Sequence, residues 1–593
     1  MQRKILLIIL LTQFSAYVRS DEKEKKWLTY YEESNYNRTP SYKETLEFSR
    51  ALADASPLLH YEIMGYSHQG REIPLLILDG NGNFSPEQVK TSGNKIVLIQ
   101  AAIHPGEPVG KDAGLILLRN MVIDRKYSDY LENITILFIP ILNVDGHERF
   151  GPFNRINQNG PEEMGWRTNA LNLNLNRDYL KADSKEIQAF LKLWHEWEPD
   201  FFIDTHSTNG GDYQYALTYS LDIFGAADPD LVKWMEKAYL PQVEVMMEAD
   251  GFPIFPYVSY RSWHDPRSGL RSGVYSPMFS TGYITELNRP GLLLETHMLK
   301  PYPIRVESTL LMILHTMDIL HRDNQLKQII LEADRFTASS GFRKEKFPVI
   351  FELTTDSVMV DFLGVEYKKK QSSLSGGYWF IYDSEKPVTY QVPWFNKNRV
   401  SYDVQLPEAY IIPVQYKDII ERLKLHGVEM RQLNRETEIE IEAYRFDDVQ
   451  LSARSTEGRQ TASFKTITLQ ETRTFPKGSV IIPMDQPRAR IIAHALEPMA
   501  PGSFAYWGFF NSVFERVEYF ESYVMEEMAR EMLAQDPSLR IGLEKAMVEN
   551  PAMARNPYAV LSWFYERTPY YDQKHNLYPV GRIMNADLLK DLK

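Results

Sequence analysis

Apolar segments of strand length recur through the first half of the chain, and segments of helical length separate them. Four segments are almost continuously apolar, at residues 95–103, 134–142, 201–205 and 292–295. Residues 110–123 and 185–197 between them have the length and apolar content of helices. Strands this apolar are buried on both faces of a sheet. We therefore predict an α/β domain whose sheet is covered by helices on both sides.

The second half of the chain has a different texture. Strand-like stretches lie at 349–354, 377–381, 388–392 and 438–444, with one helix predicted at 416–426. From Pro501 the pattern is typical of helices and is very aromatic between Phe504 and Phe514. A chain of 593 residues exceeds what one core supports. We predict an α/β domain at 21–335, a β-rich domain at 345–490 and a mainly helical region at 491–593.

The N-terminus has the pattern of a secretory signal peptide. Arg3 and Lys4 precede a short apolar run at residues 5–11, and Ser20 precedes a charged stretch. We expect residues 1–20 to be removed and the protein to be secreted or periplasmic. The chain has no cysteine, which excludes a lipidated anchor, and no second segment is long and apolar enough to form a membrane anchor.

Charge limits the partners. The net charge is −13 and the only basic run is Lys368–Lys370, which is typical of a solvated strand end. A chain without a basic face is not expected to bind nucleic acid. The sequence does not indicate an oligomeric state.

The first candidate site residues follow the strand predicted at 95–103. His104 and Glu107 lie three apart in AAIHPGEP, where functional residues of open α/β sheets gather. Imidazole nitrogen and carboxylate oxygen both bind zinc. A histidine and a glutamate three apart also occur often by chance in loops.

Two more strands end in polar residues. His206 follows the apolar run at 201–203, and Asp204 on the same strand is a candidate partner for its ring or a capping carboxylate. Two histidines and one glutamate leave a position of zinc open for water. Glu295 ends the strand at 292–295, where a carboxylate needs a partner or a role as a base. His297 is a competing ligand or a structural residue.

Arg167, Asn176 and Arg177 stand in the segment GWRTNALNLNLNRD between these motifs. The planar fork of arginine suits a carboxylate, and an amide adds a donor beside it. An ordinary surface arginine is the competing interpretation.

The ordered motifs HPGE, WRTN, NLNRD, IDTHS and LLLETH resemble those of the carboxypeptidase A-like zinc carboxypeptidase family, over roughly residues 40 to 330. The resemblance implies a mixed, mostly parallel sheet sandwiched by helices and one zinc ion per chain. It assigns the metal to His104, Glu107 and His206, the base to Glu295 and carbonyl polarisation to Arg167. Asn176 and Arg177 match the pair that binds a C-terminal carboxylate.

This chain departs from the family pattern at two points. Asn174 stands where an acidic partner of the first zinc histidine is common, although an amide also accepts a hydrogen bond. The tyrosine that covers substrate is either Tyr275 or Tyr283.

We therefore expect a zinc metallocarboxypeptidase that acts on peptides or peptide-like substrates with a free carboxylate. Two alternatives remain open at this point. The same residues suit a deacylase or a peptidoglycan stem-peptide amidase, and a binding protein with impaired catalysis would keep the fold.

Overall fold

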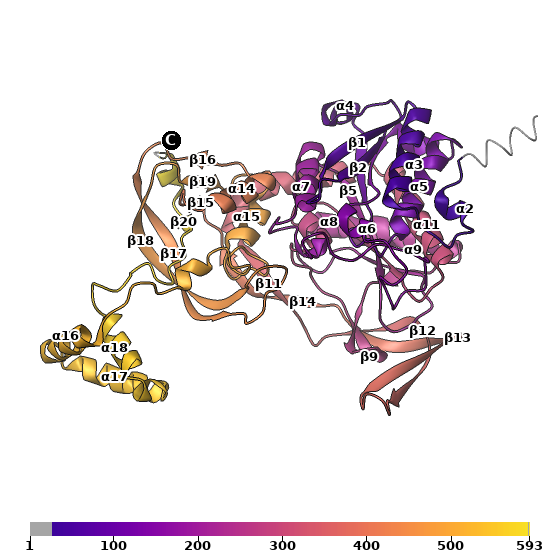
Figure 1. The fold of residues 1–593 in the computed structure, drawn as a ribbon. Coiled ribbons are helices and arrows are strands. Elements are labelled where there is room, and N and C mark those ends of the chain that lie inside the picture. The colour runs from indigo at the N-terminus through magenta and orange to yellow at the C-terminus, as the bar shows by residue number, and fades with distance from the viewer. Residues whose placement is uncertain (1–26, 591, 593) are drawn as a thin grey trace, which may run out of the picture.

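A computed structural model describes residues 27–590 and residue 592, so the predicted signal peptide lies outside the described residues. Figure 1 shows the first half of the chain as an α/β part with a strand-rich part beside it. A small group of helices from late in the sequence (α16, α17 and α18) stands apart at the lower left, whereas the C-terminus itself lies at the upper left.

The central sheet has eight strands in the order β1-β2-β4-β3-β5-β10-β6-β7. The middle strands β4, β3, β5 and β10 run parallel, whereas β1 and β2 pair antiparallel with their neighbours, and β6 pairs antiparallel with β10 and parallel with β7. This confirms the expected α/β class and mixed sheet. The strands are β1 (Leu59–Tyr66), β2 (Glu72–Leu78), β3 (Lys95–Gln100), β4 (Ile134–Ile139), β5 (Phe201–Thr208), β6 (Leu217–Ser220), β7 (Phe255–Pro256) and β10 (Gly291–His297).

Helices cover both faces of this sheet. On one face, α5 (Val109–Val122), α9 (Leu240–Ala249) and α11 (Tyr302–Arg322) share a core with the strands. On the other face, α7 (Lys185–Trp197) buries Phe190 against the sheet. The side chain of Ser184 caps the start of α7.

The face covered by α7 also packs against the second half of the chain. The core that contains Phe190 continues without a break to Phe347, Tyr410 and Phe510. Burial of apolar surface is the main stabilising contribution to a fold. The two halves of the chain are therefore held together by one shared hydrophobic core.

The second half is built on a six-stranded antiparallel sheet. We call residues 398–514 together with 575–583 the C-terminal unit. Its sheet strands are β16 (Arg431–Gln432), β19 (Val480–Pro483), β15 (Ala409–Ile412), β20 (Gly581–Ile583), β17 (Thr437–Leu451) and β18 (Ala462–Phe475), in that spatial order. Its helices are α14 (Lys417–Leu425) and α15 (Ala489–Leu496), and β14 (Asn398–Gln405) pairs with β11 (Lys346–Leu353).

Two sheets cross the boundaries predicted from the sequence. The long hairpin of β12 (Val358–Gln371) and β13 (Tyr378–Phe395) joins β8 (Ser259–Ser262) and β9 (Asp265–Arg271) in a four-stranded sheet. Strand β20, near the end of the chain, lies inside the six-stranded sheet. Pairing between strands so far apart leaves no signal in local composition.

The helices expected from Pro501 begin later. Residues 501–510 form turns and Asn511–Phe514 a single 3₁₀ turn. Phe504 and Phe510 from this aromatic segment are buried in the shared core. The α-helices that follow are α16 (Ser522–Gln535), α17 (Ser538–Glu549) and α18 (Pro557–Tyr565).

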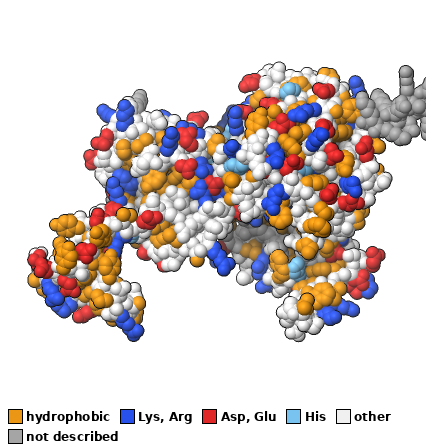
Figure 2. Space-filling model, in the orientation of Figure 1, with side chains coloured by type: hydrophobic (Ala, Val, Ile, Leu, Met, Phe, Trp, Pro, Cys, Tyr) orange, Lys and Arg blue, Asp and Glu red, His pale blue; other side chains and the backbone are white. Residues whose placement is uncertain are grey.

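We call residues 517–571 the helical module. Its helices enclose a small core of their own, which includes Met525, Leu561 and Phe564. In Figure 2 the module projects from the lower left of the molecule, with hydrophobic side chains visible on its surface. Among the described residues, no helix is long and apolar enough to cross a membrane.

Candidate active site

Three adjacent parallel strands deliver the site residues to one edge of the central sheet. His104 follows β3 after Ala102 turns the chain with a left-handed φ of 51°. His206 and Glu295 lie on β5 and β10, where they are direct register partners. Parallel strands end at the same edge, so the sequence argument from strand ends brings these residues together as expected.

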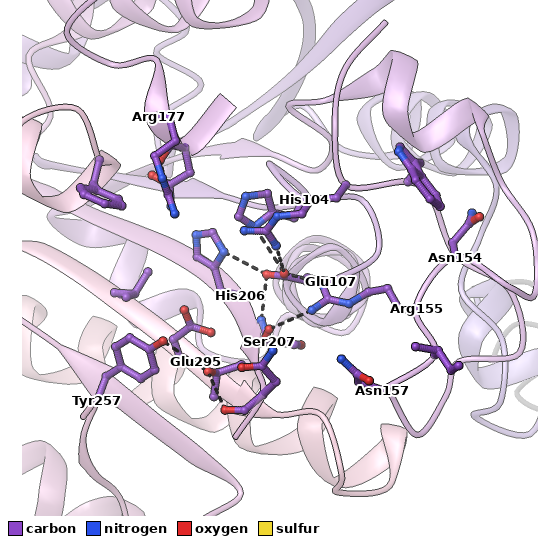
Figure 3. A pocket seen from close by; sticks show the side chains of 18 of the residues that line it. His104, Glu107, Asn154, Arg155, Asn157, Arg177, His206, Ser207, Tyr257 and Glu295 are labelled. Atoms are coloured by element: carbon purple, nitrogen blue, oxygen red, sulfur yellow. Dashed lines mark hydrogen bonds and ion pairs between the residues drawn. The ribbon is translucent and has the colours of Figure 1, made fainter. Parts of the chain in front are cut away.

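His104, Glu107 and His206 meet in a buried cluster (Figure 3). Nδ1 of His104 lies 3.3 Å from Oε1 of Glu107, and Nδ1 of His206 lies 3.0 Å from Oε2. Zinc bonds of about 2 Å separate ligand atoms in a tetrahedron by roughly 3.3 Å. The three side chains are therefore spaced as a single small cation requires.

The outer nitrogens of both histidines are held by other side chains. Nε2 of His104 donates to Oδ1 of Asn174 at 2.9 Å, and Nε2 of His206 donates to Oδ2 of Asp204 at 2.9 Å. Bonds of this kind fix the tautomer of the neutral ring, so Nδ1 is the nitrogen of each histidine that faces Glu107 and is available to a metal ion. Asn174 thus takes the hydrogen bond that an acidic residue commonly takes at this position.

Asp204 is itself held from two sides. Its Oδ1 accepts from Nε2 of Gln100 at 2.9 Å, and its Oδ2 accepts from the hydroxyl of Ser280 at 2.5 Å. All of these groups are buried. The orientation of His206 is therefore fixed by a hydrogen-bonded network that reaches two neighbouring elements.

The electrostatics of the cluster favour a cation. Burial opposes the charged form of His206, but Asp204 and Glu107 raise its pKa well above the usual value. The pKa of Glu107 is well below its usual range because Arg155 and the histidines outweigh the effect of burial. Burial lowers the pKa of His104 to about 4. Nδ1 of His104 has no hydrogen-bond partner among the described residues although it is buried, so the donor set fits a divalent metal ion.

Glu295 is half-buried, and one of its carboxylate oxygens, Oε2, is buried without a hydrogen-bond partner within the described part of the chain. Burial raises its pKa to about 8, and the charges of Glu107 and Asp204 add to the effect of burial. A carboxyl group of high proton affinity beside a metal cluster has the properties of an acid–base residue.

Two arginines contact the same carboxylate oxygen of the cluster. Nη1 of Arg167 lies 3.1 Å from Oε1 of Glu107, and Nη1 of Arg155 donates to that oxygen as well. Arg167 was expected at the site, whereas no motif pointed to Arg155, which lies in a loop of irregular spacing. Gly106 makes room for it, since a Cβ there would lie 2.5 Å from Cδ of Arg155.

Asn176 and Arg177 lie on another wall of the cavity. The guanidinium of Arg177 stacks 4.3 Å from the centre of the Phe279 ring, and burial together with Arg167 lowers its pKa. The backbone N–H of Ser280 donates to Oδ1 of Asn176 at 2.9 Å. This bond leaves the amide nitrogen of Asn176 as the polar atom available to a ligand.

The two candidate tyrosines have different positions. Tyr275 lines the cavity. Tyr283 is buried in the shared core, where its hydroxyl bonds Nδ1 of His426 at 2.9 Å, so it lies away from the cavity. Tyr257, which the sequence analysis missed, lies beside Glu295 in Figure 3 and contacts the hydroxyl of Thr208 at 3.4 Å. No local motif distinguishes Tyr257 from the other 34 tyrosines of the chain.

The cavity that joins these groups has a volume of about 630 Å³. Leu293, Tyr275 and Phe279 give it an apolar side next to Glu295 and Arg177. His297 does not belong to it, because its Nε2 donates to the backbone oxygen of Gly211 at 3.1 Å. His297 therefore has the structural role that was one of its two interpretations.

The known proteins to which this chain is similar are carboxypeptidases. Residues 45–303 match a family model described as zinc carboxypeptidase. A protein named carboxypeptidase 2 from Trichophyton rubrum is 25% identical over 498 residues, covering 79% of this chain and 84% of the relative. Its counterpart from Trichophyton equinum is 23% identical over 495 residues, with coverage of 79% and 84%.

The solved metallo-carboxypeptidase from Burkholderia cenocepacia aligns with 48% of this chain and 69% of its own, at 19% identity and a TM-score of 0.35. The match to the fungal relatives is more informative, because 79% of this chain is a larger share than the segment at 45–303 supplies. The similarity therefore extends beyond the α/β part.

Proposed function

Residues 45–303 belong to the zinc carboxypeptidase family, which makes the chain a zinc-dependent peptide hydrolase, and we propose that its cavity removes the C-terminal residue of peptides. One observation carries the proposal. Arg177 and Asn176 line the same cavity as Glu295 and the metal cluster. A peptide whose terminal carboxylate is bound there places its last amide bond near both.

His104, Glu107 and His206 would hold one zinc ion through Nδ1, a carboxylate oxygen and Nδ1. When bound, zinc acts as a Lewis acid and makes water acidic enough to attack at neutral pH. Asn174 and Asp204 keep the two imidazoles in the tautomer that presents Nδ1 to the ion. These contacts support the assignment of the metal ligands.

Glu295 would move the proton. Its unpartnered Oε2 takes a proton from the attacking water and later gives it to the nitrogen of the departing amino acid. A raised pKa suits the return of the proton, and the charge of a bound zinc ion would lower this pKa and favour the carboxylate that accepts the proton of water. Leu293, two residues before Glu295 on β10, gives the cavity an apolar wall beside this carboxyl group.

Arg167 would polarise the scissile carbonyl, and Arg155 is positioned to share this role. Both guanidinium groups already lie at one carboxylate oxygen of the cluster. A preorganised cation beside developing oxyanion charge lowers the barrier more in a buried site than in water. Tyr275 would close over the substrate from the adjacent loop.

Arg177 and Asn176 would bind the free carboxylate. The guanidinium offers a fork of donors, and the stacked Phe279 ring keeps it in place. N-acyl amino acids and the stem peptides of cell walls also carry a free carboxylate beside an amide. These compounds are the alternative substrates that the same contacts admit.

The proposal includes the division of the chain and its location. We take residues 21–335 as the catalytic part and residues 1–20 as a signal peptide removed on secretion. Expression of the full chain followed by N-terminal sequencing of the protein in the medium tests this. Recovery of only cell-associated protein that begins at Met1 would contradict it.

The activity is tested with a matched pair of peptides. Release of amino acids is measured from a peptide with a free C-terminus and from the same peptide with a C-terminal amide, with and without a zinc chelator. We expect release only from the free peptide and only without chelator. In Arg177→Ala the preference for the free carboxylate should fall about 10- to 100-fold, as expected on losing a charged hydrogen bond.

Equal cleavage of the two peptides by the wild type would reject the exopeptidase proposal while leaving the hydrolase in place. N-acyl amino acids and muropeptides are assayed beside the peptides. Faster turnover of either class would move the assignment to the corresponding alternative.

A further inference from the structure

Asn174 contacts both the metal cluster and the turn that carries Asn176 and Arg177. Its Oδ1 accepts from Nε2 of His104 at 2.9 Å and from the backbone N–H of Asn176 at 3.1 Å. One side chain therefore orients the imidazole of His104 and caps the short turn that carries Asn176 and Arg177. A displacement of Asn174 would therefore change the orientation of the His104 ring and the position of the Asn176–Arg177 turn.

The chain that continues from this turn is held by the C-terminal unit. Nη1 of Arg422 donates to the backbone oxygens of Lys181 and Ala182 at 2.7 Å each. Arg459 binds the carboxylate of Asp183 through two bonds of 2.6 Å. These contacts come from α14 and from the turn between β17 and β18, so the C-terminal unit holds residues 181–183 from outside.

The turn between β17 and β18 also reaches Asn174 itself. The backbone N–H of Asn174 donates to Oε2 of Glu457 at 2.7 Å. Glu457 is half-buried. Its φ is 49° and that of the next residue, Gly458, is 75°, so both residues have left-handed backbone conformations. Paired backbone bonds between Thr456 and Arg459, of 2.8 and 3.0 Å, close the turn.

The conformation of Glu457 is an unusual one for this residue type. A non-glycine residue with positive φ is disfavoured and persists where the surroundings require it. Here the tight turn points a carboxylate at a backbone N–H of another part of the molecule. Arg459, two residues on, fixes the same turn through Asp183.

We propose that Glu457 is a positioning residue of the active site, which fixes Asn174 and through it both the His104 imidazole and the Asn176–Arg177 turn. The part of this inference that concerns substrate rests on the proposed function, whereas the part that concerns the metal does not. The bond is charge-assisted and short, which places it among the stronger hydrogen bonds of proteins. The C-terminal unit then contributes a residue that positions the active site.

The test compares two substitutions in the full chain. Glu457→Ala removes the acceptor, whereas Glu457→Gln keeps an acceptor oxygen and removes only the charge. The exposed Glu440 on β17 of the same unit supplies the control variant Glu440→Ala. Each protein is stripped of metal, and its zinc affinity is measured by competition with a chromophoric chelator.

We expect zinc affinity to fall about tenfold in Glu457→Ala, the lower end of the range for residues that orient metal ligands. Glu457→Gln should retain the wild-type value within about threefold, and Glu440→Ala should match the wild type. The KM for a peptide with a free C-terminus should rise in Glu457→Ala along with the loss of zinc affinity. Thermal unfolding midpoints check that all variants fold, and Glu457→Ser repeats the truncation with a residue that suits turns.

Wild-type zinc affinity and wild-type KM in the folded alanine and serine variants would overturn the inference. Equal losses in Glu457→Ala and Glu457→Gln would overturn it too, since the acceptor would then be irrelevant. The metal measurement needs no substrate. If the wild type releases no amino acids while zinc affinity follows the expected order, the proposed function fails and the role of Glu457 stands.

Discussion

Glu295 lies directly across from His206 on the neighbouring strand, and this register places a carboxyl group beside the metal cluster. The backbone of β10 holds it there whether or not its side chain is charged. An isosteric substitution should therefore remove the proton transfer and leave the surroundings in place.

In Glu295→Gln we expect zinc affinity close to that of the wild type and a kcat lower by about 10²- to 10⁴-fold, the usual contribution of a general base. Metal content after dialysis and steady-state kinetics on a free peptide measure the two quantities. An unchanged kcat would remove Glu295 from the role of base.

Asp222 is a buried carboxyl group that lies outside the cavity. Its Oδ1 accepts from the backbone N–H of Phe224 at 3.3 Å, while Oδ2 has no hydrogen-bond partner within the described residues. Burial raises its pKa to about 7. The folded state therefore holds a proton between about pH 4 and 7 that the unfolded state has released.

Binding of more protons by the folded state means that stability falls as the pH rises through this window, and stays low above pH 7. A neutral amide imitates the protonated acid, so Asp222→Asn should match the wild type near pH 4.5 and gain on the order of 2 kcal/mol at pH 8. Melting temperatures at the two pH values show the gain as a few degrees. Asp54→Asn, at an exposed position, should show no such dependence; a gain of equal size at both pH values would contradict the explanation.

At the scale of elements, the contact between α5 and β5 sets the position of His206. Helix α5 is buried along its whole length, and Gly110 in its first turn touches the strand. A Cβ at Gly110 would lie 1.9 Å from Oγ1 of Thr205, the residue before His206. Only a glycine permits this approach of helix and strand.

Gly110→Ala should therefore push α5 away from β5 and displace His206. Overpacking of this kind costs about 1–3 kcal/mol or more, against a gain of about 1 kcal/mol in helix propensity. We expect a lower melting temperature together with weaker zinc binding, measured by chelator competition. Gly151→Ala, where a Cβ would meet no atom within 4 Å, is the matched control.

The position of a site residue in the strands and loops determines whether the sequence alone could predict it. His104, Glu107, His206 and Glu295 could be found because each follows or ends an apolar strand, and parallel strands end together. Arg155 and Tyr257 could not be found, since they lie in segments without periodic pattern and reach the cavity only through the tertiary fold. Tyr283 was a plausible rival to Tyr275 by its spacing alone, yet α10 (Ser280–Thr285) turns it into the core.

The fold shows the same division. The α/β sheet was predictable from its apolar strands. The C-terminal unit was recognised as strand-rich, but its link to the site was hidden because Glu457 and Asn174 are 283 positions apart in the sequence. Contacts of that range depend on the shared core between the two halves and not on any local preference.

At the scale of the whole molecule, the helical module stands apart from this shared core. The chain leaves the C-terminal unit after Phe514 and returns at Asn576, whose backbone N–H donates to the oxygen of Val513 at 2.9 Å. The core of the module contains only residues from its own segment. The two ends of the excursion are therefore adjacent, and the module adds no residue to the cavity.

We expect that residues 517–571 can be replaced by a short Gly-Ser linker with little loss of function. Zinc affinity and kcat/KM of the deletion variant should stay within about twofold of the wild type, since the loop closure adds little entropy cost. Deletion of residues 340–593 instead should expose the apolar face covered by the C-terminal unit and give aggregated protein, seen by size-exclusion chromatography. Loss of zinc binding on removal of the module alone would show that it supports the site after all.

Strand β20 follows the module in the chain but pairs with β15 and β17 inside the six-stranded sheet. The tail from Tyr578 onward is thus anchored by sheet bonds and by buried side chains such as Val580 and Ile583. A protease that cuts once among α16, α17 and α18 would leave a two-chain molecule rather than release a fragment. The module marks a natural point at which the protein can be split and reassembled by complementation.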